Sequence, residues 1–72
     1  MIDKYITMIN DGGMFCVRWR VGNKIYKCST GYRTHRLTQE TRRKIFLLVF
    51  NYFHSGNRSK EEMRAFIRSI KL

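Results

Sequence analysis

Apolar and polar residues alternate from residue 14 to residue 21, which is the pattern of a β-strand with one buried face. Glycine-containing turn signals bound this segment, Asp11-Gly12-Gly13 before it and Gly22-Asn23 after it. Glycine supplies the positive φ that tight hairpin turns need, so the chain is expected to reverse at both places. The pattern therefore predicts an antiparallel sheet with three strands, over residues 5–10, 14–21 and 24–30.

A two-residue turn at Gly22-Asn23 determines which residues face each other across the second hairpin. Val21 is expected opposite Lys24, and the pairing continues stepwise to Cys16 opposite Ser29. With a similar turn in the first hairpin, one face carries Ile6, Met8, Phe15, Val17, Trp19, Tyr26 and Cys28. The other face carries Tyr5, Thr7, Ile9, Arg18, Arg20, Ile25, Lys27 and Ser29. The first face is predicted to be core, so its aromatic rings are not expected to stack on bases, and the second is predicted to be mostly cationic.

The second half of the chain has helical periodicity. Thr38 is a suitable N-cap and Gly56 a natural stop, which predicts a helix over residues 38–55. Its apolar stripe is Ile45, Leu48, Val49, Tyr52 and Phe53, widened by Phe46, Leu47 and Phe50. Ser59 followed by Glu62 is a capping box for a second helix over residues 60–71. The stripe of that helix is Met63, Phe66, Ile67 and Ile70.

These elements predict one α+β domain over residues 1–72, with the order β-β-β-α-α. A three-stranded antiparallel sheet packs on a long helix, and a second short helix follows. Because the long helix is apolar almost all round, it needs cover on two sides, from the sheet and from the second helix. We expect a monomer, although such a helix would also suit a helical dimer interface.

Charge changes the picture more than any other feature of the composition. The 72 residues include 15 Lys and Arg but 5 Asp and Glu, so the formal net charge is +10. This excess favours a polyanionic partner, nucleic acid ahead of an anionic membrane surface. No apolar run is long enough for a membrane span, so we expect no membrane partner. The chain carries no export signal, which makes the cytoplasm the expected compartment.

Candidates for catalysis or metal binding are few. Cys16 and Cys28 are expected on opposite faces of the sheet, which excludes a disulfide and leaves one core thiol and one surface thiol. Together with His35 and His54 they lack the spacing of zinc ligands. The carboxylates are scattered, and the chain has neither a phosphate loop nor a nucleophile elbow. We therefore expect no enzyme activity, no metal and no cofactor.

The basic residues carry the functional signal, because nine of the fifteen fall between residues 18 and 44, where Glu40 is the only acid. These nine candidate DNA-binding residues are Arg18, Arg20, Lys24, Lys27, Arg33, Arg36, Arg42, Arg43 and Lys44. Like charges that face each other on a sheet are destabilising, and a bound polyanion relieves that repulsion.

Guanidinium groups can form paired hydrogen bonds with guanine edges and with phosphate oxygens, so the nine residues can be divided into two expected roles. We expect Arg18, Arg20 and Lys27 to reach base edges in the major groove of double-stranded DNA. Phosphate contacts are expected from Arg33, Arg36, Arg42, Arg43 and Lys44.

The stretch over residues 15–34 has the order strand, short turn with Gly and Lys, strand, and Ser-Thr-Gly-Tyr-Arg-Thr. It resembles the N-terminal arm-type DNA-binding domains of phage and transposon tyrosine recombinases, which are related in fold to plant AP2-type domains. The resemblance implies a three-stranded sheet packed on one helix and inserted in the major groove, with Arg18, Arg20 and Lys27 facing the groove. The longer first helix, the second helix and the lack of a catalytic domain depart from that family. The resemblance implies an accessory, regulatory or arm-binding role in a phage or mobile element.

Two other functions stay open. A phage-encoded inhibitor of a host defence protein would use the apolar members of the outer sheet face, Ile9, Met14, Cys16 and Ile25. An RNA-binding module is the other alternative, although double-stranded RNA-binding domains usually begin with a helix, and none is expected here.

Overall fold

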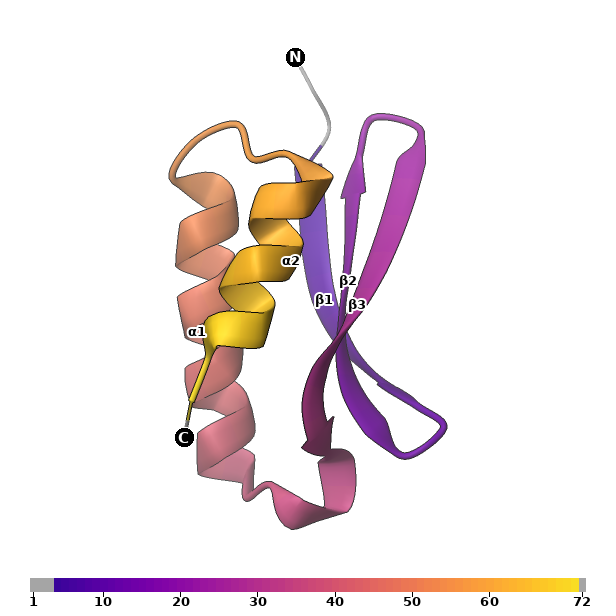
Figure 1. Cartoon of the computed structure of the whole chain (residues 1–72), viewed down its shortest axis with the longest axis vertical. Coiled ribbons are helices and arrows are strands. Elements are labelled where there is room, and N and C mark those ends of the chain that lie inside the picture. The colour runs from indigo at the N-terminus through magenta and orange to yellow at the C-terminus, as the bar shows by residue number, and fades with distance from the viewer. Residues whose placement is uncertain (1–3, 72) are drawn as a thin grey trace.

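The computed structural model describes residues 4–71, so residues 1–3 and 72 of the expected domain lie outside the described part of the chain. Its elements, in chain order, are β1 (Lys4–Asp11), β2 (Met14–Val21), β3 (Lys24–Arg33), a 3-10 helix (Thr34–Arg36), α1 (Gln39–His54) and α2 (Lys60–Ser69). The strands form one antiparallel sheet in the order β1-β2-β3. Both helices lie on the same side of this sheet and leave its other face open (Figure 1). The predicted α+β fold with the order β-β-β-α-α is confirmed.

The predicted pairing of the strands is also confirmed. Val21 pairs with Lys24, and the ladder runs without a break to Cys16 opposite Ser29. Gly12 and Gly13 both have positive φ, as a type I′ turn requires, whereas in the second hairpin only Gly22 does. The expected core face is turned toward the helices, and the ring of Trp19 lies 5.6 Å from that of its partner Tyr26. Trp19 is therefore a core residue, only 1% exposed.

The third strand is longer than predicted, because it continues beyond residue 30, where it was expected to end, to Arg33. After Ser29 the register shifts, and Arg33 pairs with Met14 at the far end of β2. Two extra residues of β3 are accommodated there, and Gly31 within this bulge has a φ of +86°. The buried hydroxyl of Thr30 donates to the Phe15 carbonyl at 2.6 Å, which holds the bulge against β2.

Both helices begin where the sequence predicts, and α1 ends at His54, within one residue of its predicted end. Thr38 caps α1 by accepting a hydrogen bond from the Thr41 N–H at 3.1 Å, and the capping box of Ser59 and Glu62 is present in α2. Gly56 follows the C-cap Ser55, as expected of a residue that stops the helix, but its φ is not positive, so it does not form the left-handed glycine cap. The second helix ends at Ser69 instead of residue 71, since Ile70 has an extended conformation.

The core lies between the sheet and the helices, with α1 against β1 and α2 against β3. Ile45, Val49 and Phe53 form the buried side of α1, and Met63 and Ile67 that of α2. The two helices meet where the rings of Tyr52 and Phe66 stack at 4.0 Å. The fully apolar stripe predicted for α1 is only partly buried: Leu47, Leu48 and Phe50 are exposed, because α2 covers one flank of α1 and not its outward side.

Replacing Trp19 should lower the free energy of unfolding, because its side chain packs in the core and does not face a ligand. Trp19→Ala is expected to lose about 3–5 kcal/mol of unfolding free energy, the usual range for a buried large aromatic residue. Since a small domain can unfold outright after such a loss, Trp19→Phe serves as the measurable variant in urea titrations followed by circular dichroism. Ile25→Ala, on the exposed face of the same sheet, is the control and should stay within about 0.5 kcal/mol. Unchanged stability of Trp19→Phe would contradict its place in the core.

Candidate nucleic-acid interface

The face of the sheet opposite the helices, called here the outer face, is built by the alternation of side chains along three strands. The pairing places its residues in successive rows: Tyr5, Arg20 and Ile25; Thr7, Arg18 and Lys27; Ile9, Cys16 and Ser29; Asp11, Met14 and Arg33. Arg18 and Arg20 occupy the central strand, so both guanidinium groups are offered from the middle of the face. Neither helix covers this face (Figure 1).

A shallow, open depression of about 370 Å³ lies on the outer face and is lined by Tyr5, Arg18, Arg20 and Ile25. The residues come from all three strands, with Tyr5 and Ile25 on either side of Arg20. The Arg20 Nε donates to the carbonyl of Gly22 at 2.9 Å, which holds this side chain toward the β2–β3 turn. The depression therefore combines two positive charges, of which that of Arg20 is held in place, with one aromatic and one aliphatic surface, which suits an anionic, planar ligand.

Lys27, the third residue expected to reach base edges, is already paired. Its ammonium group donates to the Asp11 carboxylate at 2.5 Å, and both side chains are about half exposed. The hydrogen bond and the charge of Asp11 raise the pKa of Lys27 above its ordinary value. A polyanion would have to displace this carboxylate before it could use the charge of Lys27.

Cys16 corrects the expectation of one core thiol and one surface thiol. Although its register places it on the outer face, Cys16 is only 4% exposed, and Cys28 is buried on the inner face. The ion pair between Lys27 and Asp11 joins β3 to β1 across β2, and Cys16 lies between the two rows that it connects. Burial raises the pKa of the Cys16 thiol, which disfavours the reactive thiolate. Both cysteines are free thiols, as expected.

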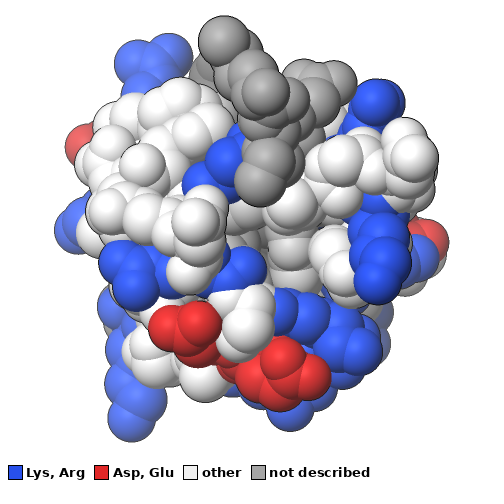
Figure 2. Space-filling view, turned by 90° about the horizontal axis from the view of Figure 1, so that it is seen from above, with Lys and Arg blue, Asp and Glu red and all other residues white. Residues whose placement is uncertain are grey.

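Only four of the nine candidate residues lie together on the outer face, namely Arg18, Arg20, Lys27 and Arg33. Lys24 is exposed at the β2–β3 turn but has the register of the inner face, and Arg36 is exposed in the 3-10 helix. Arg43 and Lys44 belong to α1 and are separated from the outer face by the sheet. Lys and Arg side chains also occupy several sides of the molecule in Figure 2, so the excess charge is not confined to one face.

Arg42, the remaining candidate, has a structural role. Its side chain is half-buried, and Nη2 donates to the Thr34 carbonyl at 2.8 Å. Its Nε is buried and has no hydrogen-bond partner within residues 4–71. The side chain therefore ties the start of α1 to the 3-10 helix, so its guanidinium group is not presented on an open surface.

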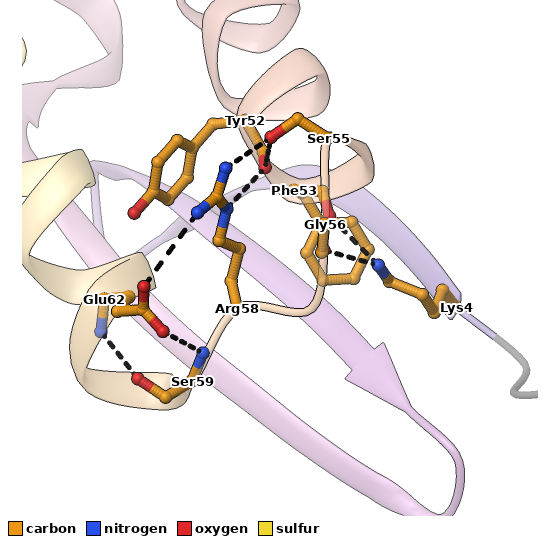
Figure 3. A network of polar contacts seen from close by, with 8 residues as sticks. All are labelled: Lys4, Tyr52, Phe53, Ser55, Gly56, Arg58, Ser59 and Glu62. Carbon is orange, nitrogen blue, oxygen red and sulfur yellow. Dashed lines mark hydrogen bonds and ion pairs between the residues drawn. The ribbon is translucent and has the colours of Figure 1, made fainter.

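Two further cations, which the sequence did not single out, cap the C-terminus of α1 (Figure 3). The Lys4 ammonium donates to the carbonyls of Phe53 and Gly56 at 3.1 and 3.0 Å. Arg58 donates to the Tyr52 carbonyl at 3.2 Å and to the Ser55 hydroxyl at 2.6 Å, and its guanidinium lies over the Tyr52 ring. The last carbonyls of a helix lack partners within it and carry partial negative charge, which both cations satisfy.

Only part of this cap had a signal in the sequence. A cation soon after a helix end is a known device, and Arg58 follows His54 by four residues. Lys4 gave no such signal, because it is 49 residues from Phe53 in the chain. Part of the basic excess is thus used inside the fold.

Comparisons with known proteins returned no match: no protein-family model, no curated protein and no solved structure matches the chain. Among residues 4–71, no three His, Cys, Asp or Glu side chains are placed to hold a metal ion. Within the same range, no helix is long and apolar enough to cross a membrane. The resemblance to recombinase arm-type domains stays a prediction.

The capping box should make stability depend on pH. The Glu62 carboxylate accepts a hydrogen bond from the Ser59 N–H at 3.0 Å, which is the main reason that the pKa of Glu62 lies below its ordinary value of 4.5. A carboxyl group with a lowered pKa stabilises the fold above its unfolded pKa and loses that effect as the pH falls through its folded pKa. Glu62→Gln should therefore be less stable than the parent near neutral pH, and the difference should shrink from about pH 5 downward.

Urea unfolding at a series of pH values measures this difference. Glu61→Gln, which removes a neighbouring charge outside the capping box, is the matched control. A gap between Glu62→Gln and the parent that stays constant with pH would show that the ionised carboxylate is not responsible.

Proposed function

We propose that this chain is a small basic module that binds double-stranded DNA by placing the outer face of its sheet in the major groove. The observation that supports this best is the open depression lined by Arg18, Arg20, Tyr5 and Ile25, in which Arg20 lies between Tyr5 and Ile25. Bidentate guanidinium groups suit the O6 and N7 acceptors of guanine, and an aliphatic side chain suits the methyl group of thymine. An accessory, regulatory or arm-binding role in a phage or mobile element follows from the resemblance of residues 15–34.

The dimensions of the sheet agree with those of the groove. Neighbouring strands are about 4.8 Å apart, so the backbones of β1 and β3 are separated by roughly 10 Å, against a major groove about 12 Å wide. Arg18 and Arg20 are two residues apart on β2, which is roughly 6.6 Å along the strand. This spacing equals about two base-pair steps of 3.4 Å, so the two side chains would contact separate base pairs.

Phosphate contacts are proposed for cations at the two ends of the outer face and for Lys27, which is paired with Arg18. Arg33 lies at one end of the outer face, and Lys24 is exposed at the turn that marks the other end of β3. Lys27 would add a third contact once a phosphate replaces Asp11. Arg42, Arg43 and Lys44 are left out of the proposed interface, because Arg42 is engaged by Thr34 and the other two lie in the helix layer.

The inhibitor alternative is less well supported by the same face. Of its four apolar residues, Ile25 is 55% exposed, whereas Cys16 is buried and Ile9 and Met14 are half-buried. They do not form one continuous exposed surface. The RNA-binding alternative is distinguished by comparing duplex DNA, duplex RNA and single strands in one titration series.

Arg18→Ala should reduce sequence discrimination. Arg18 is exposed on the outer face, so its truncation is expected to leave the fold intact and to cost about 1–3 kcal/mol of preference at one base pair. Fluorescence anisotropy with selected and mixed-sequence duplexes, at about 50 and 200 mM salt, measures the loss. The slope of log K against log salt should be about −0.9 for each phosphate neutralised.

Arg64→Ala is the matched control, since it removes the same charge from the exposed surface of α2. It should change discrimination much less than Arg18→Ala. Equal losses of discrimination in the two variants would mean that the chain attracts DNA by its net charge only. Absence of duplex DNA binding at the lower salt concentration would overturn the proposed function.

A further inference from the structure

The outward side of α1 is opposite to the side that packs on the sheet. Ile45, Val49 and Phe53 recur every four residues on the buried side and are at most 1% exposed. A helix turns by about 100° per residue, so Leu47, two residues after Ile45, points away from the core. Leu47 is 50% exposed, although a leucine is usually buried.

Two neighbours extend this exposed leucine into a patch. Leu48 lies to one side of it and is 43% exposed, and Phe50 lies to the other side and is 38% exposed. The Phe50 ring is 5.5 Å from that of Phe46 and 4.4 Å from that of His54, so these rings form a ridge along the helix. Leu47, Leu48 and Phe50 are called here the α1 patch, and they are three of the five large hydrophobic side chains that are exposed in residues 4–71.

The second helix does not cover the α1 patch. It packs beside α1 through the stacked rings of Tyr52 and Phe66, and its buried residues Met63 and Ile67 belong to the common core. The patch is also remote from the outer face, because the sheet lies between them (Figure 1). It therefore has no place in the proposed DNA interface.

Two cations flank the N-terminal end of the patch. Arg43 precedes Leu47 by four residues, and Lys44 precedes Leu48 by four, so each cation lies one helical turn from an exposed leucine. Both cations are exposed, and Glu40, in the first turn, is the only acid in α1. An apolar strip with a cationic rim is complementary to an apolar strip with a carboxylate rim.

We infer that the α1 patch, with Arg43 and Lys44, is a docking surface for an acidic amphipathic helix of another protein. A second copy of this chain is a poorer occupant, because it would bring the same cationic rim and a further net charge of +10. A helix suits the patch, since Leu47 and Phe50 lie three residues apart along α1 and the rings of Phe46, Phe50 and His54 recur every four residues. Such a ridge can pack against the groove of another helix. With the two surfaces on opposite sides of the sheet, partner binding does not depend on the proposed DNA binding.

The test is an NMR titration of the ¹⁵N-labelled full chain with a synthetic helical peptide whose leucine stripe is flanked by glutamates. Two matched peptides carry lysines in place of the glutamates or serines in place of the leucines. The glutamate-flanked peptide should shift amide signals of α1 and bind about tenfold more tightly than either control. Signals of Arg18 and Arg20 should stay in place.

Variants of the chain assign the contacts. Leu47→Gln should weaken the binding of the glutamate-flanked peptide about tenfold. Ile25→Gln removes a similarly exposed apolar side chain from the outer face and should leave that binding unchanged. The double variant Arg43→Glu and Lys44→Glu reverses the charge beside the patch. It should therefore bind the lysine-flanked peptide more tightly than the glutamate-flanked peptide. Leu47→Gln, which leaves the net charge unchanged, should keep the parent's melting temperature and its affinity for duplex DNA, which separates this test from that of the proposed function.

Several results would overturn the inference. Equal binding of the glutamate-flanked and lysine-flanked peptides would show that the charges of Arg43 and Lys44 do not select the partner. No binding of the glutamate-flanked peptide would contradict the docking surface itself. Shifts confined to the outer face would mean that the peptide binds to the depression at Arg18 and Arg20 instead of the α1 patch. Self-association in sedimentation equilibrium that Leu47→Gln abolishes would assign the patch to a second copy, and binding to anionic vesicles in preference to the peptide would assign it to a lipid surface.

Discussion

The register of β2 between its two neighbours is the constraint on which the rest of the molecule depends. Side chains alternate between the faces of a sheet, so a slip of one residue would exchange them. In the observed register Trp19 packs under the helices, and Arg18 and Arg20 emerge on the opposite face. Two short turns hold this arrangement, with glycine at the positions of positive φ. The core and the candidate interface are therefore two consequences of one pairing.

Basic residues serve two purposes in this chain. Lys4 and Arg58 neutralise the C-terminal carbonyls of α1, and Arg42 ties the start of that helix to the residues before it. Lys27 is balanced by Asp11 across the sheet. The charges that are offered to a ligand are consequently fewer than a net charge of +10 suggests. What distinguishes the outer face is the way in which one strand presents two guanidinium groups beside an aromatic and an aliphatic side chain.

The placement of both helices on one face of the sheet gives the molecule two dissimilar surfaces. The outer face is open because nothing packs on it, and the outward side of α1 is open because α2 lies at its flank. The first surface is cationic and shallow, whereas the second is an apolar ridge with a cationic rim. Under the two proposals made above, the nucleic acid and the helical partner would bind to opposite sides of the molecule.

The sequence by itself determined the element order, the strand register, the capping box of α2 and the separation of Trp19 from Arg18. Each of these follows from local rules: turn chemistry, a period of two in strands and a period of about 3.6 in helices. Tertiary structure decided the extension of β3 to Arg33, the burial of Cys16, the exposure of Leu48 and the capping of α1 by Lys4. These depend on contacts between segments distant in the chain, where a neighbouring strand, an ion pair across the sheet or the lateral position of a helix sets the environment of a residue.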